Sequence, residues 1–251
     1  MLQGAGWIKL EQMYSAADVE RAKEVVYHHN QADKRNTTLN KHKHETRDEA
    51  HNKYNGLVWA LFNKGRIFEK MAQHPVILNI SNVILGETSQ ISSLAANTVL
   101  PGQEGQLPHL DYPYYRCSTP QQYWLSLSSV LSVHSNQLTF YVLQNLSGCR
   151  SFYPSTNHNI MDTAPPLAVQ FVTLLSDFTK ENGGTGIRPH SHHQPRYPDD
   201  VEDFYANMIQ MEGKAGDVVV FAGAIQHCAM PNRSKGLRTG MLQHMVPVYI
   251  K

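Results

Sequence analysis

Pro108-His109-Leu110-Asp111-Tyr112 is the stretch from which the fold and the chemistry of this chain can be argued. In a β-strand the side chains at positions i and i+2 point the same way. His109 and Asp111 would therefore face one point, with their Cα atoms roughly 7 Å apart. The intervening Leu110 would face a hydrophobic layer. The pattern predicts a strand over residues 107–112 that presents two polar ligands on one face.

A third candidate ligand, His227, lies far downstream in a segment patterned as strand, turn and strand. Val218 to Phe221 is a β-branched and aromatic run, and a polar turn at 231–236 leads into a second run from Leu237. A His-x-Asp pair with one remote His is the ligand set of the facial triad, which holds non-haem Fe(II) and leaves the opposite face open. His109, Asp111 and His227 are therefore candidate metal ligands and catalytic residues.

Arg238 follows His227 by eleven residues and stands near the start of the second strand. A guanidinium binds a carboxylate through two parallel hydrogen bonds. The spacing suggests that a dicarboxylate co-substrate fills part of the open face. A lone His-x-Asp pair is weak evidence in a chain with 14 His. The pair, the remote His and the Arg, each in a strand context, are much more specific together.

The composition is that of a globular protein. One domain is the default for 251 residues and 28.4 kDa. The net charge of +1 gives no reason to expect a nucleic-acid or membrane partner. No apolar run is long enough for a membrane span, and the N-terminus lacks the pattern of a signal peptide. Three widely spaced Cys without a Cys-x-x-Cys pair argue against a disulfide framework, so we expect a cytoplasmic protein.

The distribution of patterns along the chain predicts the fold class. Ser15 has the character of an N-cap before a helix over 16–30, and residues 57–73 carry a second helical pattern. From about Gln90 the pattern changes to short strands and turns. We therefore expect a mainly β protein with N-terminal helices, built as a double-stranded β-helix, the jelly roll of cupins.

We expect a single domain over residues 1–251. It would consist of a helical N-terminal part (1–90) and a jelly-roll core (91–250) with a long insertion at about 112–166. Loops of that length are usually functional or carry structure of their own.

The run LLSDFTKENGGTGIRPHSH (174–192) resembles the phytanoyl-CoA dioxygenase family. That family typically shows a strand, a Glu-Asn-Gly-(Gly/Ala)-Thr turn and a strand that ends Pro-Gly-Ser-His. With the flanking motifs, the resemblance covers roughly residues 91–250. It implies that His109, Asp111 and His227 bind Fe(II), that Arg238 binds the C5 carboxylate of 2-oxoglutarate, and that O2 is the oxidant.

The resemblance also implies co-substrate contacts for three polar residues, Gln106, Thr185 and Asn97. The candidate substrate contacts are Tyr112, Tyr114, Arg116 and Arg188. Two positions depart from the family pattern. His190 stands where the family motif has Gly, and Ala229 stands where the family often has Ser.

Several functions are compatible with these patterns. The favoured one is an Fe(II)- and 2-oxoglutarate-dependent oxygenase that hydroxylates, desaturates or cyclises a small molecule and releases succinate and CO2. The intact Asp111 favours this over halogenation, because halogenating relatives carry Gly or Ala there. The alternatives are a cupin-type metal-dependent enzyme that does not use 2-oxoglutarate, or a non-catalytic jelly-roll binding protein. A homodimer is left open.

Overall fold

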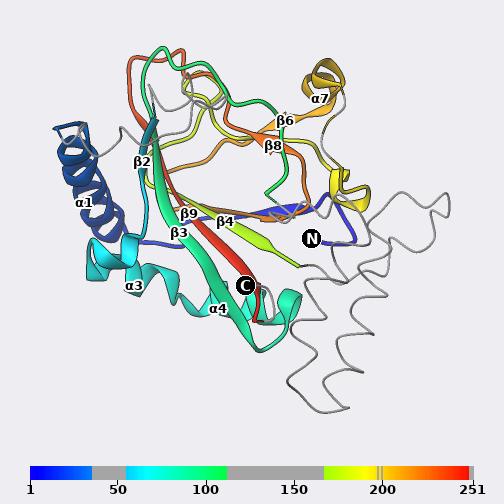
Figure 1. Cartoon of the computed structure of the whole chain (residues 1–251), viewed down its shortest axis with the longest axis horizontal. Helices are drawn as coiled ribbons and strands as arrows, with labels where there is room; N and C mark the ends of the chain where they lie inside the picture. Colours follow the sequence, from blue (N-terminus) through cyan, green and yellow to red (C-terminus); the bar gives the residue numbers. More distant parts are fainter. Residues whose placement is uncertain (36–54, 112–166, 197, 199, 249–251) are drawn as a thin grey trace, which may run out of the picture.

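The fold consists of two antiparallel sheets that face each other, with helices flanking the larger sheet (Figure 1). The structure is a computed structural model, and it describes residues 1–35, 55–111, 167–196, 198 and 200–248. The larger sheet has six strands in the order β1-β7-β4-β9-β3-β2, and the smaller has three in the order β6-β5-β8. Two facing antiparallel sheets with helices at the N-terminal end are the jelly-roll architecture that the sequence predicted.

The elements have the following bounds. The larger sheet contains β1 (Trp7–Leu10), β2 (Asn55–Val58), β3 (Ser89–Val99), β4 (Val169–Leu174), β7 (Val218–Ala222) and β9 (Arg238–Pro247). The smaller sheet contains β5 (Gly186–Ile187), β6 (Ile209–Gln210) and β8 (His227–Cys228). The helices are α1 (Ala16–Arg35), α3 (Arg66–Ala72), α4 (Pro75–Leu85) and α7 (Val201–Asn207), with 3-10 turns η2 (Leu61–Asn63) and η4 (Ser191–His193).

The central strands of the larger sheet are buried on both faces. Every residue of β4 and of β7 is buried. Alternate side chains serve two hydrophobic clusters, as the two-residue period of a strand requires. Phe171 and Val220 pack toward the helices, whereas Val172 and Phe221 pack into the space between the two sheets. The second cluster lies on the same side of the sheet as the candidate site.

The N-terminal part contributes strands as well as helices. α1 begins at Ala16 as predicted, and the Ser15 Oγ accepts a hydrogen bond from the backbone N–H of Asp18 at 3.2 Å. The second helical pattern, over 57–73, is confirmed from Arg66 onward as α3, whereas its first residues form the edge strand β2. A short apolar run fits either a strand or a helix, and pairing with β3 decides it here.

The strand expected over 107–112 is reduced to one bridge. His109 pairs with His227 in an isolated antiparallel bridge, and Asp111 lies in a bend just beyond it. The expected insertion at 112–166 lies outside the described residues, and so do Tyr112, Tyr114 and Arg116.

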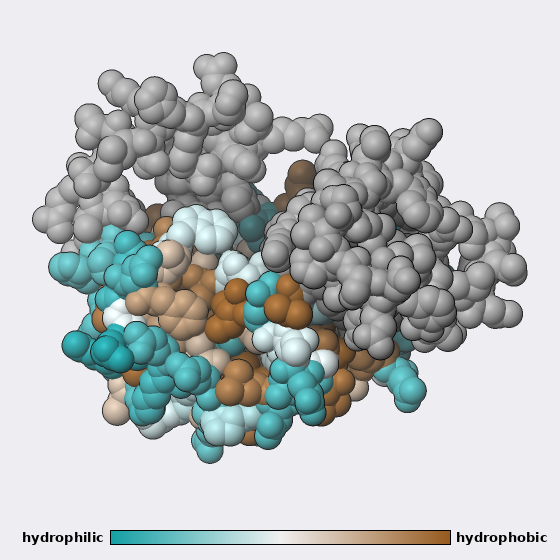
Figure 2. Space-filling view, turned by 60° about the horizontal axis from the view of Figure 1, so that its bottom comes forward, coloured by the Kyte–Doolittle hydropathy of each residue, from teal (hydrophilic) through white to brown (hydrophobic). Residues whose placement is uncertain are grey.

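The outer surface mixes polar and apolar side chains on the face shown in Figure 2. α4 exposes three aliphatic side chains, those of Val76, Leu78 and Val83. None of the helices in the described ranges has the length and apolar character needed to cross a membrane.

Truncating the core of β4 tests this packing. Phe171 is fully buried between the sheet and the helices. Phe171→Ala should lower the free energy of unfolding by about 3–5 kcal/mol, because it removes buried apolar surface and leaves a cavity. Val83→Ala, at a position that is 86% exposed, should change it by less than about 0.5 kcal/mol. Urea denaturation of both variants measures the difference, and equal effects would contradict the assigned core.

Candidate metal centre

The two histidines and the aspartate of the predicted triad come together at the edge of the smaller sheet. One ligand atom from each of His109, Asp111 and His227 lies within 4.8 Å of the others. The Asp111 carboxylate stands 3.8 Å from Nε2 of His109 and 3.4 Å from Nε2 of His227. Two imidazoles and one carboxylate on one side of a point are the donor set of a facial Fe(II) site.

Backbone pairing fixes the two histidines relative to each other. The N–H of each residue donates to the carbonyl of the other at 2.9 Å. Residues paired in this way project their side chains from the same face of the sheet. The two imidazole rings accordingly lie side by side, with their centroids 4.6 Å apart. This single bridge aligns the two ligands, a role that the sequence pattern predicted for a longer strand.

Each imidazole is oriented by a carbonyl two residues before it. Nδ1 of His109 lies 2.8 Å from the carbonyl oxygen of Leu107, and Nδ1 of His227 lies 3.0 Å from that of Ile225. A carbonyl only accepts, so Nδ1 carries the proton in both rings. This tautomer leaves both Nε2 atoms, the ones that face Asp111, available to a metal.

The electrostatics of the triad favour an ionised carboxylate. Burial by itself would raise the pKa of Asp111, but the neighbouring His227 and His109 lower it to about 2. For His227, burial lowers the pKa, but the Asp111 carboxylate outweighs burial and the net shift is upward. The carboxylate is thus ready to bind a cation at neutral pH, and protons compete with that cation mainly for the histidines.

Arg238 opens β9 and is buried on the face of the larger sheet that looks toward the smaller one. Its side chain is 4% exposed, and Nε and Nη2 have no hydrogen-bond partner. Its guanidinium carbon lies 4.7 Å from the centre of the Phe178 ring. Burial lowers the pKa of Arg238 to about 10. A buried cation with two unpaired donors is suited to an anion, and a carboxylate fits its fork geometry.

The three other predicted co-substrate residues differ in their surroundings. Asn97 of β3 lies opposite Gly240, two residues along β9 from Arg238, and its Oδ1 is buried without a partner. Gln106 is engaged with the backbone of Ala229, whose N–H donates to its Oε1 at 3.1 Å. Thr185 directly precedes β5. Asn97 therefore stands nearest to Arg238 in the sheet register.

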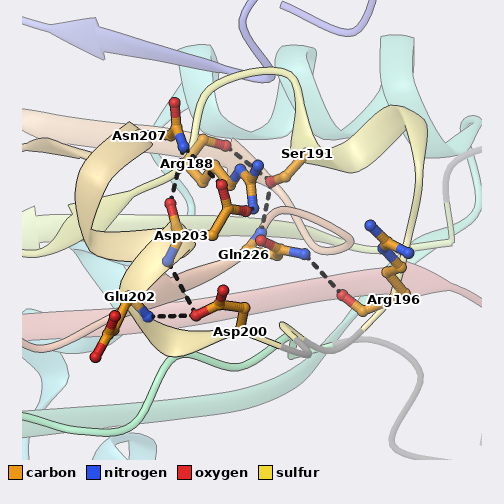
Figure 3. A network of polar contacts seen from close by, with 8 residues as sticks. All are labelled: Arg188, Ser191, Arg196, Asp200, Glu202, Asp203, Asn207 and Gln226. Carbon is orange, nitrogen blue, oxygen red and sulfur yellow. Dashed lines mark hydrogen bonds and ion pairs between the residues drawn. The ribbon is translucent and has the colours of Figure 1, made fainter.

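Arg188 does not face the triad. Its neighbour Ile187 pairs with His227 and packs into the cluster between the sheets, so Arg188 projects from the other face. There it forms an ion pair of 2.6 Å with Asp203 of α7 (Figure 3). Arg188 is thus engaged on the face away from the triad, and its contact with the substrate stays a prediction.

The His-containing motif after Arg188 braces the segment before His227. Ser191 Oγ donates to the carbonyl of Arg188 and accepts from the N–H of Gln226, both at 2.8 Å (Figure 3). His190, at the Gly position of the family motif, has a positive φ of 64°. His192 bonds to the carbonyl of Leu2 through Nε2. These contacts are structural.

A steric constraint explains why the turn at Asn182-Gly183-Gly184 contains glycine. The Asn182 side chain accepts from the N–H of Thr179 and donates to the carbonyl of Asp177. Gly183 has a φ of 82°, and a Cβ there would lie 2.3 Å from the carbonyl oxygen of Met230. The turn thus packs directly on the chain that leaves β8, and only glycine fits.

Sequence reasoning missed two polar residues on the inner face of the larger sheet, Gln170 and His244. Both are buried, and they lie opposite each other on β4 and β9. The signal was present in the alternation, because His244 lies an even number of residues from Arg238 on one strand.

Comparison with known proteins fits this geometry. The model of the family described as "Phytanoyl-CoA dioxygenase (PhyH)" matches residues 2–156 and 132–240. The chain belongs to the phytanoyl-CoA dioxygenase family. Its fold is also that of the crystal structure of HygX from Streptomyces hygroscopicus with nickel and 2-oxoglutarate bound. The TM-score is 0.61 at 11% identity, over 99% of this chain and 85% of HygX.

Curated relatives of this phytanoyl-CoA dioxygenase family member include fungal dioxygenases. Dioxygenase aneA of Aspergillus aculeatus is 33% identical over 129 residues, which are 51% of this chain and 42% of the relative. Dioxygenase olcK of Penicillium canescens is 34% identical over 122 residues, which are 47% of this chain and 37% of the relative. The matches thus span about two fifths of the length of these relatives.

Removing one histidine tests the metal centre. His109→Ala should weaken Fe(II) binding by more than about 100-fold, because loss of a ligand exceeds the 10–100-fold typical of an outer partner. His193→Ala is the matched control, since His193 is also half-buried but lies outside the triad. Anaerobic titration calorimetry measures both. Undiminished stoichiometric binding by His109→Ala would contradict the assignment.

Acidification should release the metal through the histidines. Metal binding needs neutral imidazole, and the pKa of His227 is raised above its ordinary value of 6.5. Affinity should therefore fall as the pH drops through about 7 toward 6, the range in which imidazole gains its proton. Asp111, with a pKa of about 2, stays ionised throughout. An affinity that held constant down to about pH 5 and then fell would instead point to the carboxylate.

Proposed function

We propose that this chain is an Fe(II)- and 2-oxoglutarate-dependent oxygenase that oxidises a C–H bond of a small molecule with release of succinate and CO2. The observation that carries the proposal is that the fold provides a cation site and an anion site on the inner sides of its two sheets. The His109–Asp111–His227 cluster offers a cation site, and a buried Arg238 with unpaired donors offers an anion site. Membership of the phytanoyl-CoA dioxygenase family supports the same chemistry.

The residues present fit both groups. The triad would hold Fe(II) through Nε2 of His109, Nε2 of His227 and the Asp111 carboxylate, and three ligands leave positions open for further donors. Arg238 would bind the distal carboxylate of 2-oxoglutarate, which satisfies the two buried nitrogens that lack partners. Asn97 stands close enough in register to assist, and we also assign co-substrate contacts to Gln106 and Thr185. Bound iron and 2-oxoglutarate together supply the means to activate O2.

The protein's own part is to position and to shield. The paired backbones and the Nδ1 hydrogen bonds hold both imidazoles in one orientation before any metal arrives. Phe178 lies against the guanidinium of Arg238, and Phe221 lies 4.9 Å from the His227 ring. These rings help to bury Arg238 and His227, and burial strengthens the attraction of a charged group for its ligand.

We propose a small-molecule substrate for this single domain, in line with the dioxygenases among its relatives. The intact Asp111 favours hydroxylation, desaturation or ring formation, because a carboxylate occupies the place that a halide would need. In a metal enzyme that does not bind 2-oxoglutarate, no co-substrate carboxylate would pair with the buried nitrogens of Arg238 that lack partners. A non-catalytic binding protein would have no use for the triad.

We also propose a homodimer. The supporting observation is the exposed aliphatic side chains of α4, Val76, Leu78 and Val83. Light scattering of the purified protein distinguishes a dimer from a monomer.

Loss of the guanidinium should separate co-substrate binding from metal binding. Arg238→Ala should raise the KM for 2-oxoglutarate by at least about 30-fold, since removing one partner of a buried charge pair costs about 2–5 kcal/mol. Fe(II) affinity should stay within about threefold, because Arg238 is not a metal ligand. Succinate formation as a function of 2-oxoglutarate concentration measures the first effect.

Arg233→Ala is the matched control for this experiment. Arg233 lies in the same turn-and-strand segment, but it is exposed. The control variant should keep the wild-type KM. Full turnover of Arg238→Ala at low 2-oxoglutarate would show that the co-substrate is held elsewhere. Absence of any Fe(II)-dependent succinate from the wild-type protein would overturn the proposed function itself.

A further inference from the structure

The inner face of the larger sheet presents a row of three side chains opposite the triad. Phe221 of β7 pairs in register with Gln170 of β4, which in turn pairs with His244 of β9. The Phe221 ring lies 4.9 Å from the ring of His227 on the facing sheet. The row therefore runs directly across the space between the sheets from the metal centre.

Strand alternation shows that Gln170 and His244 point into this space. Val172 and Leu242, each two residues away on the same strand, belong to or pack against the hydrophobic cluster between the sheets. His244 is near enough to the triad to interact electrostatically with Asp111 and His227. Burial lowers its pKa first, and the charges on Asp111 and His227 then act on it in opposite directions. Both polar residues thus lie on the inner face of the larger sheet, on the side of the triad.

The side-chain oxygen of Gln170 lacks a hydrogen-bond partner in this position. It is 5% exposed, and its Oε1 is buried without a hydrogen-bond partner. Buried polar groups in native proteins are nearly always paired, so an exception beside a site calls for a ligand. A side-chain amide oxygen only accepts, so its partner must be a donor. The carboxylates and the keto group of 2-oxoglutarate are acceptors and cannot fill this role.

We propose that Gln170, with His244 beside it, forms a subsite for the primary substrate that accepts a hydrogen bond from a substrate hydroxyl. The inference rests on the proposed oxygenase function and narrows its substrate class to alcohols. A hydroxyl anchored at Gln170 would also orient the substrate and so determine which of its carbons lies near the triad. Gln170 and His244 are accordingly specificity residues, separate from the Arg238 end that takes the co-substrate.

The experiment compares an alcohol with the ketone of the same carbon frame. The wild-type protein is loaded with Fe(II) and 2-oxoglutarate without oxygen, and loading is checked by the charge-transfer absorption of that complex. Calorimetry then gives the affinities for two matched pairs, cyclohexanol with cyclohexanone and trans-1-decalol with trans-1-decalone. At least one alcohol should bind about 10-fold more tightly than its ketone, the value of one good hydrogen bond. Gln170→Leu should bring that ratio to about 1 without weakening 2-oxoglutarate binding.

Gln243→Leu is the matched control. Gln243 is also a buried glutamine of the larger sheet whose Oε1 lacks a hydrogen-bond partner. It lies one residue from His244 and so projects to the opposite, helix-covered face, where its Nε2 donates to the carbonyl of Ala72. The control should keep the alcohol preference. Gln170→Met keeps the length of the side chain and serves if Gln170→Leu does not fold.

Each outcome has a definite meaning. A ketone preference, no preference, or no measurable binding of any alcohol by the wild-type protein would overturn the inference. So would an alcohol preference that persists in Gln170→Met or Gln170→Leu. If the Fe(II)·2-oxoglutarate complex fails to form in the wild type, the proposed function fails instead, and the two failures are thereby distinguished.

Discussion

The mutual pair of backbone hydrogen bonds between His109 and His227 is the interaction on which the site depends. It ties the segment before Asp111 to the smaller sheet and fixes both imidazoles on one face. The rest of the site is arranged around that pair. Carbonyls of Leu107 and Ile225 set the ring orientation, and Asp111 needs only a bend to reach both Nε2 atoms. Two hydrogen bonds thus replace the regular strand that a ligand pair of this spacing usually occupies.

The larger sheet divides its two faces between stability and chemistry. The face toward the helices packs most of the apolar core, together with a few buried polar side chains such as Gln243. The inner face combines an apolar cluster with buried polar groups, among them Asn97, Gln170 and Arg238, whose hydrogen-bonding capacity is not fully used. Leaving such groups unpaired opposes folding. Asn97, Gln170 and Arg238 lie on the face toward the triad, where bound ligands would pair with them.

Much of the fold and the centre of the site could be predicted from sequence. The apolar runs of β4, β7 and β9 and the N-cap at Ser15 act locally, so their patterns were sufficient. The second helical pattern held only from Arg66 onward, because a short apolar run such as that at Leu57 does not say whether a neighbouring strand will pair with it. The ion pair of Arg188 with Asp203 could not be predicted, because it depends on the tertiary fold and on the register of Ile187 with His227. The inward direction of Gln170 likewise depends on which face of β4 the helices cover.

The order of strands in the larger sheet has a consequence for how the protein reaches this structure. β1 pairs with β7, and β3 pairs with β9, so the first strands find their partners near the other end of the chain. Pairings between distant segments carry a high entropic cost of loop closure and make folding slow. His109 and His227 meet only through such long-range pairing. The two imidazoles of the metal centre are therefore brought together by the tertiary pairing itself and not by any local segment of the chain.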